Sequence, residues 1–369
     1  MRVSASVDRL LSPRSWIVVA ASSVVACAPA APPPDFAPDP SIVDAIESIR
    51  ITAPVSACPG QELSATYEAV LEGGFRLPFV NVYDDEGPPT LHVTFLSLQS
   101  RQATPREDDG GWLLHADPLR SAMEGFRLTA FVENRPVLRA ERVVEPEYSC
   151  MKHELVLRGQ PGAPGPAVVV RIDELSSPFH DRLIVVEVLA EGRAPAYAFA
   201  EADAVGEEDW LLLESRGGQG HPGIAGYAGN RGGDGGTCQA GGGGGPGSIG
   251  GRGGPGGAGG SFTVIFPAER AYLARLVRTR TPGGRGGPGG RGGGGGAGGS
   301  GGPAGPNCNA GTSGPRGRNG PSGMPGSGGP AGPPAKIRPV TTEVFRRDSP
   351  AALRALIEYS RREDPTGIR

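Results

Sequence analysis

The chain has 369 residues, and its 62 Gly and 38 Pro make up about 27% of it. A content this high without a period is typical of low-complexity or disordered chains, so the spacing of the glycines decides between order and disorder. With 36 basic and 39 acidic residues the formal net charge is −3, which excludes a strongly basic nucleic-acid-binding protein and an acidic tail protein. The length allows two or three modest domains.

The first 26 residues have the features of an export signal. Basic residues precede an apolar stretch at 16–26, which is too short to cross a bilayer of about 30 Å. The stretch ends in the sequence VVAC, which resembles the lipobox of bacterial lipoproteins, with Cys27 as its cysteine. The resemblance implies cleavage before Cys27, acylation of Cys27 with palmitate-type chains and, because Ala28 rather than Asp follows, sorting to the outer membrane, on its periplasmic or cell-surface face. An ordinary secretory signal with a chance Cys is the alternative.

The segment after the signal, residues 27–46, is rich in Pro. Pro-rich chains adopt extended polyproline II and act as semi-rigid spacers. We therefore expect a tether that holds the folded part away from the membrane.

Four further cysteines follow the tether: Cys58, Cys150, Cys238 and Cys308. An even number in an exported chain predicts two disulfides, for which three connectivities are possible. We favour the sequential pairing, which joins Cys58 to Cys150 and Cys238 to Cys308. No two cysteines lie at ligand spacing, so no metal site is expected.

Two β-rich regions are predicted before the glycine-rich part. Apolar or alternating runs recur about every ten residues within 47–150, between Gly and Pro turn sequences, and this spacing fits an Ig-like sandwich. The runs lie at 49–51, 64–71, 77–82, 91–98, 126–132 and 137–144, with a short helix at 119–124. Residues 151–216 contain five more runs and predict a second small sheet, with strands at 155–157, 167–172, 183–189, 197–201 and 210–214.

The glycines keep a period of three, which is the strongest signal in the chain. From 217 to 259 every third residue is Gly except Cys238, and a second run keeps the period over 283–301. The frame then slips by one residue and continues over 302–332, where only Cys308 replaces Gly. Because both exceptions are cysteines, we expect one disulfide to join the two runs.

A period of three matches a polyproline II-type helix, which has three residues per turn and no internal hydrogen bonds. Only Gly lets two such backbones approach and pair N–H with C=O, because it has no β-carbon. We therefore predict a polyglycine II bundle at 217–335, in which one chain folds back repeatedly and the Pro-richer stretch 302–334 forms outer helices. A collagen trimer and a disordered segment are the alternatives. The first run is poor in Pro and Cys308 occupies a Gly position, which disfavours collagen.

An insert at 261–282 separates the two glycine runs. It predicts strands at 261–266 and 276–281 around a helical turn at 267–274, with Pro267 at the first helical position. We expect both strands to pair with the second sheet and to fix the bundle to it.

The C-terminal region, 336–369, predicts a strand at 340–345 and then a helix that ends near Arg362. Asp348 or Ser349 is expected to cap the helix, with Pro350 at its first position. Its predicted apolar face consists of Leu353, Leu356 and Ile357.

The order of these blocks resembles that of glycine-rich, collagen-like exported lipoproteins of deltaproteobacteria, myxobacteria among them. The shared features are the lipobox, the Pro-rich tether, the Cys-closed β domain, the second sheet, the GGxGG blocks around an insert and the Pro-rich final run. The resemblance implies a structural or adhesive role at the cell surface.

No motif indicates catalysis or a cofactor: no Walker sequence, GxSxG, HExxH or EF-hand loop occurs. We read the polar cluster 152–154 as the start of a surface strand. Candidates for a cationic surface toward polysaccharide or lipopolysaccharide are Arg285, Arg291, Arg316 and Arg318, and solubility of the rod is the alternative reason for them. The sequence thus predicts a non-enzymatic, mainly β envelope lipoprotein that displays a glycine-rich bundle for surface structure, adhesion or binding. Its partners are the membrane through Cys27 and a polysaccharide, lipopolysaccharide or envelope protein, without nucleic acid; a collagen-like trimeric stalk is the alternative.

Overall fold

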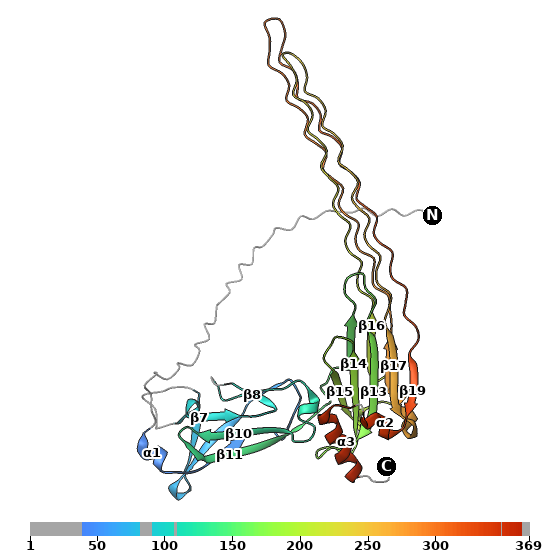
Figure 1. Cartoon of the computed structure of the whole chain (residues 1–369). Helices are drawn as coiled ribbons and strands as arrows, with labels where there is room; N and C mark the ends of the chain where they lie inside the picture. Colours follow the sequence, from blue (N-terminus) through green and yellow to red (C-terminus); the bar gives the residue numbers. More distant parts are fainter. Residues whose placement is uncertain (1–38, 82–90, 107–108, 348, 364–369) are drawn as a thin grey trace, which may run out of the picture.

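A computed structural model of the chain describes residues 39–81, 91–106, 109–347 and 349–363. The described part is mainly β and has three parts (Figure 1). An N-terminal unit (residues 46–146) lies beside a base unit (residues 154–216, 261–280 and 336–363). A long rod (residues 217–260 and 283–332) projects from the base unit, and it contains no regular helix or strand.

The N-terminal unit consists of small sheets built from short strands. One sheet has the order β1-β4-β5-β6, a second β2-β11-β10-β7 and a third β3-β9-β8. The bounds are α1 Pro40–Asp44, β1 Ile46–Thr52, β2 Ser56–Ala57, β3 Glu62–Leu63, β4 Thr66–Leu71, η1 Glu72–Gly74, β5 Arg76–Val80, β6 Leu91–His92, η2 Val93–Phe95, β7 Leu96–Gln99, β8 Ala103–Pro105, β9 Trp112–Leu114, η3 Pro118–Arg120, β10 Phe126–Val132 and β11 Arg135–Pro146.

Alternating apolar residues hold these sheets together. In β10, Phe126, Leu128, Ala130 and Val132 are buried while the residues between them are not, as expected of a strand with one face on the core. Sequence reasoning missed β9, whose Trp112 is fully buried. The Trp112 indole N–H donates to the Tyr67 hydroxyl at 2.9 Å, so this large side chain is buried without an unpaired donor. The predicted helix at 119–124 is only a short 3₁₀ turn, η3.

The base unit contains two sheets that pack on each other. The order is β12-β16-β18 in the smaller sheet and β15-β14-β13-β17-β19 in the larger. The bounds are β12 Glu154–Arg158, β13 Ala167–Leu175, β14 Leu183–Ala190, β15 Ala196–Glu201, η4 Ala202–Ala204, β16 Leu211–Arg216, β17 Ser261–Pro267, η5 Ala268–Leu276, β18 Val277–Arg280, β19 Lys336–Val340, α2 Thr342–Arg347 and α3 Ala351–Glu363.

Strand β14 begins with a continuous apolar run at 183–186, because both of its faces are covered. Ile184 and Val186 on one face belong to the core between the two sheets. Leu183 and Val185 on the other face belong to a second core. There they pack with α3 through Leu353, Leu356 and Ile357, so the predicted apolar face of this helix is confirmed. A strand covered on both faces needs no polar alternation.

The insert pairs with the base unit as predicted. Strand β17 pairs in parallel with β13, and β18 pairs in parallel with β16. The predicted helical turn is the 3₁₀ segment η5, and Pro267 ends β17 instead of starting the helix, with an extended ψ of 132°.

The predicted strand at 340–345 is wrong. The strand β19 ends at Val340, opposite Pro267 at the end of β17. Beyond this point the neighbouring strand offers no further backbone partners, and the chain turns into α2. The sequence VTTEVF is rich in β-branched residues, so local propensity favoured a strand that the sheet does not extend to.

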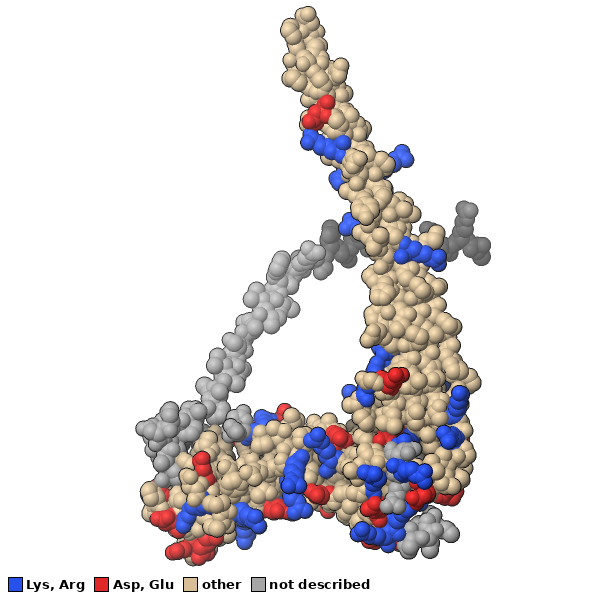
Figure 2. Space-filling view, in the orientation of Figure 1, with Lys and Arg blue, Asp and Glu red and all other residues tan. Residues whose placement is uncertain are grey.

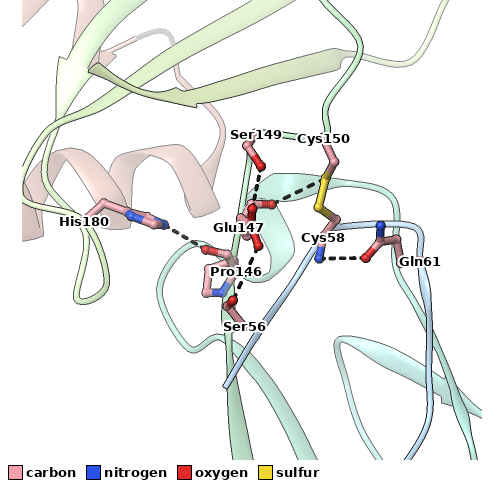
Figure 3. The surroundings of a disulfide bond; sticks show 8 residues. All are labelled: Ser56, Cys58, Gln61, Pro146, Glu147, Ser149, Cys150 and His180. Carbon is pink, nitrogen blue, oxygen red and sulfur yellow. Dashed lines mark hydrogen bonds between the residues drawn. A yellow bond between two sulfur atoms is a disulfide. The ribbon is translucent and has the colours of Figure 1, made fainter. Parts of the chain in front are cut away.

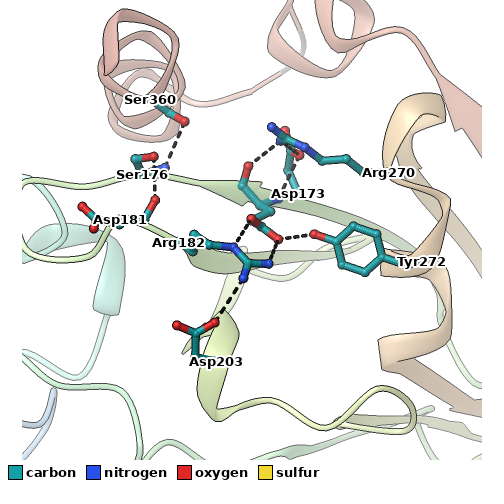
Figure 4. A network of polar contacts seen from close by, with 9 residues as sticks. Asp173, Ser176, Asp181, Arg182, Asp203, Arg270, Tyr272 and Ser360 are labelled. Carbon is teal, nitrogen blue, oxygen red and sulfur yellow. Dashed lines mark hydrogen bonds and ion pairs between the residues drawn. The ribbon is translucent and has the colours of Figure 1, made fainter. Parts of the chain in front are cut away.

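A polar network around the buried carboxylates of Asp173 and Glu174 fastens η5 to β13 (Figure 4). The Arg270 guanidinium donates to the Asp173 carboxylate at 2.8 Å. Glu174 accepts hydrogen bonds from Arg182, at 2.8 Å, and from the Tyr272 hydroxyl. Burial raises the pKa of the Asp173 carboxyl to about 6, against the opposing effect of Arg270. Burial would also raise the pKa of Glu174, but the hydrogen bonds from Arg182 and Tyr272 outweigh it and lower that pKa.

The raised pKa of Asp173 predicts that the base unit gains stability on mild acidification. Between about pH 6 and pH 4 the folded protein binds this proton more tightly than the unfolded chain, so the contribution of Asp173 to the free energy of unfolding rises as pH falls. We expect a gain of about 1–2 kcal/mol between pH 7 and pH 5, measured by urea unfolding followed by circular dichroism. Glu174, with its lowered pKa, titrates below this window. Asp173→Asn should lose the gain, and identical pH profiles for the two proteins would contradict the assignment.

Candidate functional site: the glycine-rich rod

Four extended segments form the rod, and each continues a strand of the base unit (Figure 1). Segment 1 (residues 217–235) follows β16 and segment 2 (241–260) leads into β17. Segment 3 (283–302) follows β18 and segment 4 (311–332) leads toward β19. Strands β16 and β18 are parallel neighbours, and β17 and β19 are as well. The base unit therefore places segment 1 beside segment 3 and segment 2 beside segment 4.

Backbone hydrogen bonds join the segments at every third residue. Segment 1 donates to segment 3, as from Gly220 N–H to the Arg285 carbonyl at 2.8 Å, and segment 2 donates to segment 4. Segment 2 also donates to segment 1, segment 3 to segment 2, and segment 4 to segment 3. Segments 2 and 3 therefore have three neighbours each, whereas segments 1 and 4 have two and do not pair with each other.

The number of glycines per triplet follows the number of neighbours. Segments 2 and 3, the inner ones, consist mostly of Gly-Gly-x triplets, such as GGR, GGP and GGA. Segments 1 and 4, the outer ones, consist mostly of Gly-x-x triplets: GHP, GIA, GYA and GNR in segment 1, and GTS, GPR, GRN, GPS and GMP in segment 4. A third neighbour is thus accompanied by a second Gly in nearly every turn.

Steric contact explains this correspondence. A β-carbon on Gly250, the first Gly of a triplet in segment 2, would lie 2.0 Å from the carbonyl oxygen of Gly290. A β-carbon on Gly290, the second Gly of a triplet in segment 3, would lie 1.9 Å from the carbonyl oxygen of Ile224. Backbone atoms cannot move aside as a flexible side chain can, so only Gly fits at these positions.

Ser248 is the one second position in segment 2 that is not Gly, and the geometry accounts for it. Second positions of segment 2 face N–H groups of segment 1: a β-carbon on Gly245 would lie 3.2 Å from the nitrogen of Asn230. The matching position in segment 3 faces the other side of the same residue, where a β-carbon on Gly296 would lie 2.0 Å from the Asn230 carbonyl oxygen. The Ser248 hydroxyl uses the available room and accepts the Tyr227 N–H at 2.7 Å.

The disulfide Cys238–Cys308 closes the free end of the rod. Cys238 lies between segments 1 and 2, and Cys308 lies between segments 3 and 4, so the bond connects the two turns. Cys238 has φ 61°, a conformation that favours Gly, and its N–H donates to the Pro303 carbonyl at 2.9 Å. These are the two positions where Cys interrupts the glycine period.

The second disulfide, Cys58–Cys150, lies at the junction of the N-terminal and base units (Figure 3). Next to it, a His180 ring nitrogen of the base unit lies 2.9 Å from the Pro146 carbonyl oxygen of β11. The two disulfides have the sequential pairing that the sequence favours. Cys27, the predicted lipidation site, lies outside the described residues.

Charged side chains are sparse on the rod and dense on the two folded units (Figure 2). Segments 1 to 4 carry six Arg and one Asp, a formal charge of +5, so the remainder of the chain carries −8. Arg231 pairs with Asp234 at 2.9 Å. Lys152, His153 and Glu154 lie exposed at the start of β12, as the sequence indicates.

The part of the chain that the structure describes contains no group of three or more His, Cys, Asp or Glu that could hold a metal ion. Its helices are all too short or too polar to cross a membrane. Comparison of the chain with protein-family models, curated proteins and solved structures gives no match.

The steric contacts of the glycines predict different effects on stability for two positions of segment 3, Gly290 and Gly294. Gly290→Ala should lower the free energy of unfolding of the rod by about 1–3 kcal/mol, because its β-carbon overlaps the Ile224 carbonyl. Gly294→Ala is the matched control: a β-carbon there meets nothing within 4 Å, so we expect no loss, or a gain of about 0.4–1 kcal/mol from a less flexible unfolded chain. Hydrogen exchange of the rod amides measures both variants, and equal protection in the two would contradict this prediction.

Proposed function

We propose that this protein is a non-enzymatic lipoprotein of the cell envelope that displays the rod for surface structure, adhesion or binding. The observation that carries this proposal is the direction of the side chains. The inside of the rod consists of backbone alone, and the triplet residues that carry side chains face outward, most of them exposed. Such a rod offers a long surface and no enclosed site for chemistry.

We further propose that the rod is a polyglycine II bundle, with an Ig-like sandwich as the N-terminal unit. The period of three and the hydrogen bonds from every third N–H support the bundle, since a polyproline II-type chain has no internal hydrogen bonds to satisfy these groups. In a collagen-like trimer the glycines of three chains would meet at one axis. Here the close contacts at the triplet glycines are made within one chain, which favours the bundle.

The lipid anchor at Cys27 and the outer-membrane location form part of the same proposal. Disulfides persist in oxidising compartments outside the cytosol, and the two disulfides here support export. Residues 40–44 of the predicted tether at 27–46 form α1, and Ile46 begins β1. We propose as the spacer to the membrane the Pro-rich part before Asp39, which lies outside the described residues. The block order is that of glycine-rich exported lipoproteins of deltaproteobacteria, to which we assign the chain.

Membrane attachment should depend on Cys27. The full chain, expressed in a Gram-negative host, should incorporate radiolabelled palmitate and fractionate with outer membranes, because acyl chains on Cys27 provide the anchor. Cys27→Ser, the control, should lose the label and remain in the soluble periplasmic fraction with its disulfides formed. Palmitate incorporation into the Cys27→Ser variant, or an unlabelled soluble native chain, would refute the anchor.

A single chain should suffice for the rod. Light scattering of the soluble Cys27→Ser protein should give the mass of one chain, and circular dichroism should show a polyproline II-type signal that melts cooperatively. Reduction of the disulfides should lower the melting temperature, because each bond closes a loop of the unfolded chain. A trimeric mass would favour the collagen-like stalk, and a non-cooperative loss of signal would favour a disordered segment.

A further inference from the structure

The rod has two broad sides with different side chains. In the outer segments 1 and 4, the third residue of each triplet lies toward segment 3. Arg231 donates to the Ser300 hydroxyl at 3.1 Å, and Arg316 donates to the Gly295 carbonyl at 3.1 Å. Second positions lie toward segment 2: the Ile224 side chain lies against Gly251, and Pro315 lies beside Gly243. We call these the segment 3 side and the segment 2 side.

Four arginines stand on the segment 3 side: Arg231, which pairs with Asp234, and three others at regular intervals. Arg285 and Arg291 are exposed third positions of segment 3, six residues apart. The bonds Gly314 N–H to Gly299 and Gly317 N–H to Gly296 place Arg316 at the level of residue 297, six residues further. At the rise of about 3.1 Å per residue of a polyproline II-type chain, neighbouring arginines are about 19 Å apart along the rod.

These three guanidinium groups have no acidic partner on the rod. Asp234 is the only carboxylate of segments 1 to 4, and it pairs with Arg231. The residues between the three arginines on this side are uncharged and include Ala225, Pro288 and Asn319. The three guanidinium groups therefore stand among uncharged residues, and apart from the Arg316 bond to Gly295 their donors are available to carboxylate or sulfate groups.

We propose that the segment 3 side binds a linear acidic polysaccharide through Arg285, Arg291 and Arg316. A spacing of about 19 Å is too large for two of these arginines to hold one small anion, so the ligand must repeat its negative charges along an extended chain. The charge of +5 on the rod and −8 on the remainder of the chain directs a polyanion to the rod and away from the folded units. The inference rests on the proposed rod and names its ligand class.

The segment 2 side differs and serves as an internal control. Arg252 is an exposed third residue of a triplet in segment 2. Arg318, like Pro315, is the second residue of a triplet in segment 4, and such residues lie toward segment 2. This side also has exposed apolar side chains, Ile224, Tyr227, Ile249 and Met324, which are 66–79% exposed. Removing two arginines from either side changes the net charge of the protein by the same amount. A difference in ligand binding between two such double variants therefore shows to which side the ligand binds.

The test measures binding of the full-length protein in detergent to immobilised polygalacturonate, a polyuronate, with uncharged dextran as the blank. Arg285→Gln/Arg291→Gln should weaken binding about tenfold, as expected for the loss of two exposed charge-assisted contacts. Arg252→Gln/Arg318→Gln should weaken it less than about twofold. Binding of the native protein should fall steeply between 50 and 300 mM NaCl, because salt screens exposed charges.

Three results would overturn the inference. Equal weakening in both double variants would mean that net charge alone acts. Binding to phosphatidylglycerol vesicles but not to polygalacturonate would indicate a membrane surface as the ligand instead. Absence of binding to polygalacturonate, with the rod amides protected from exchange, would refute the ligand and leave the proposed rod intact, whereas unprotected rod amides would refute the proposed function itself.

Discussion

The rod depends on one steric condition: the carbonyl oxygens of one segment approach the glycines of the next so closely that these glycines have no room for a β-carbon. At Gly250 and Gly290 the distance between such a β-carbon and the facing oxygen would be about 2 Å. This approach brings N–H and C=O groups of different segments within 2.7–3.0 Å, so extended chains without internal hydrogen bonds satisfy their backbone groups away from water. Backbone contacts replace apolar side chains as the interior, which fits a chain with only 37% hydrophobic residues.

The base unit supplies what the rod lacks, namely a fixed register. Because the interior of the rod is glycine backbone repeated every three residues, it has no pattern of packed side chains to prevent one segment from sliding past another by three residues. Strands β16, β17, β18 and β19 fix the lower ends of the four segments in a packed core, and Cys238–Cys308 joins the turns at the far end. The network around Asp173 and Arg270 holds η5 on β13, so the insert between the glycine runs stays in position.

Periodicity in the sequence predicted the main strands and, through its two interruptions, the Cys238–Cys308 disulfide. The order of the segments predicted the pairing of the insert with the base unit and the Cys58–Cys150 disulfide. The sequence could not show where a sheet stops: 340–345 has strand propensity, yet β19 ends at Val340 because its neighbour β17 ends opposite. The polar network was also missed, because Asp173 and Arg270 are 97 residues apart and look like ordinary surface charges in the sequence. From the sequence, the arginines were grouped without regard to side, and the contacts made by second and third triplet positions separate Arg318 from Arg316.

The count of glycines also limits the rod to four segments. An outer segment has one Gly per triplet, and that Gly already faces the inside, as at Gly220, where a β-carbon would lie 2.1 Å from the Gly254 carbonyl oxygen. Its two other residues carry β-carbons on the outer surface, so a fifth segment or a second copy could not approach as closely as the inner segments do. The outward residues are correspondingly free of packing constraints, and His221, Tyr227 and Arg291 can change without loss of the interior. The backbone specifies the fold of the rod, and its side chains are left to determine what it binds.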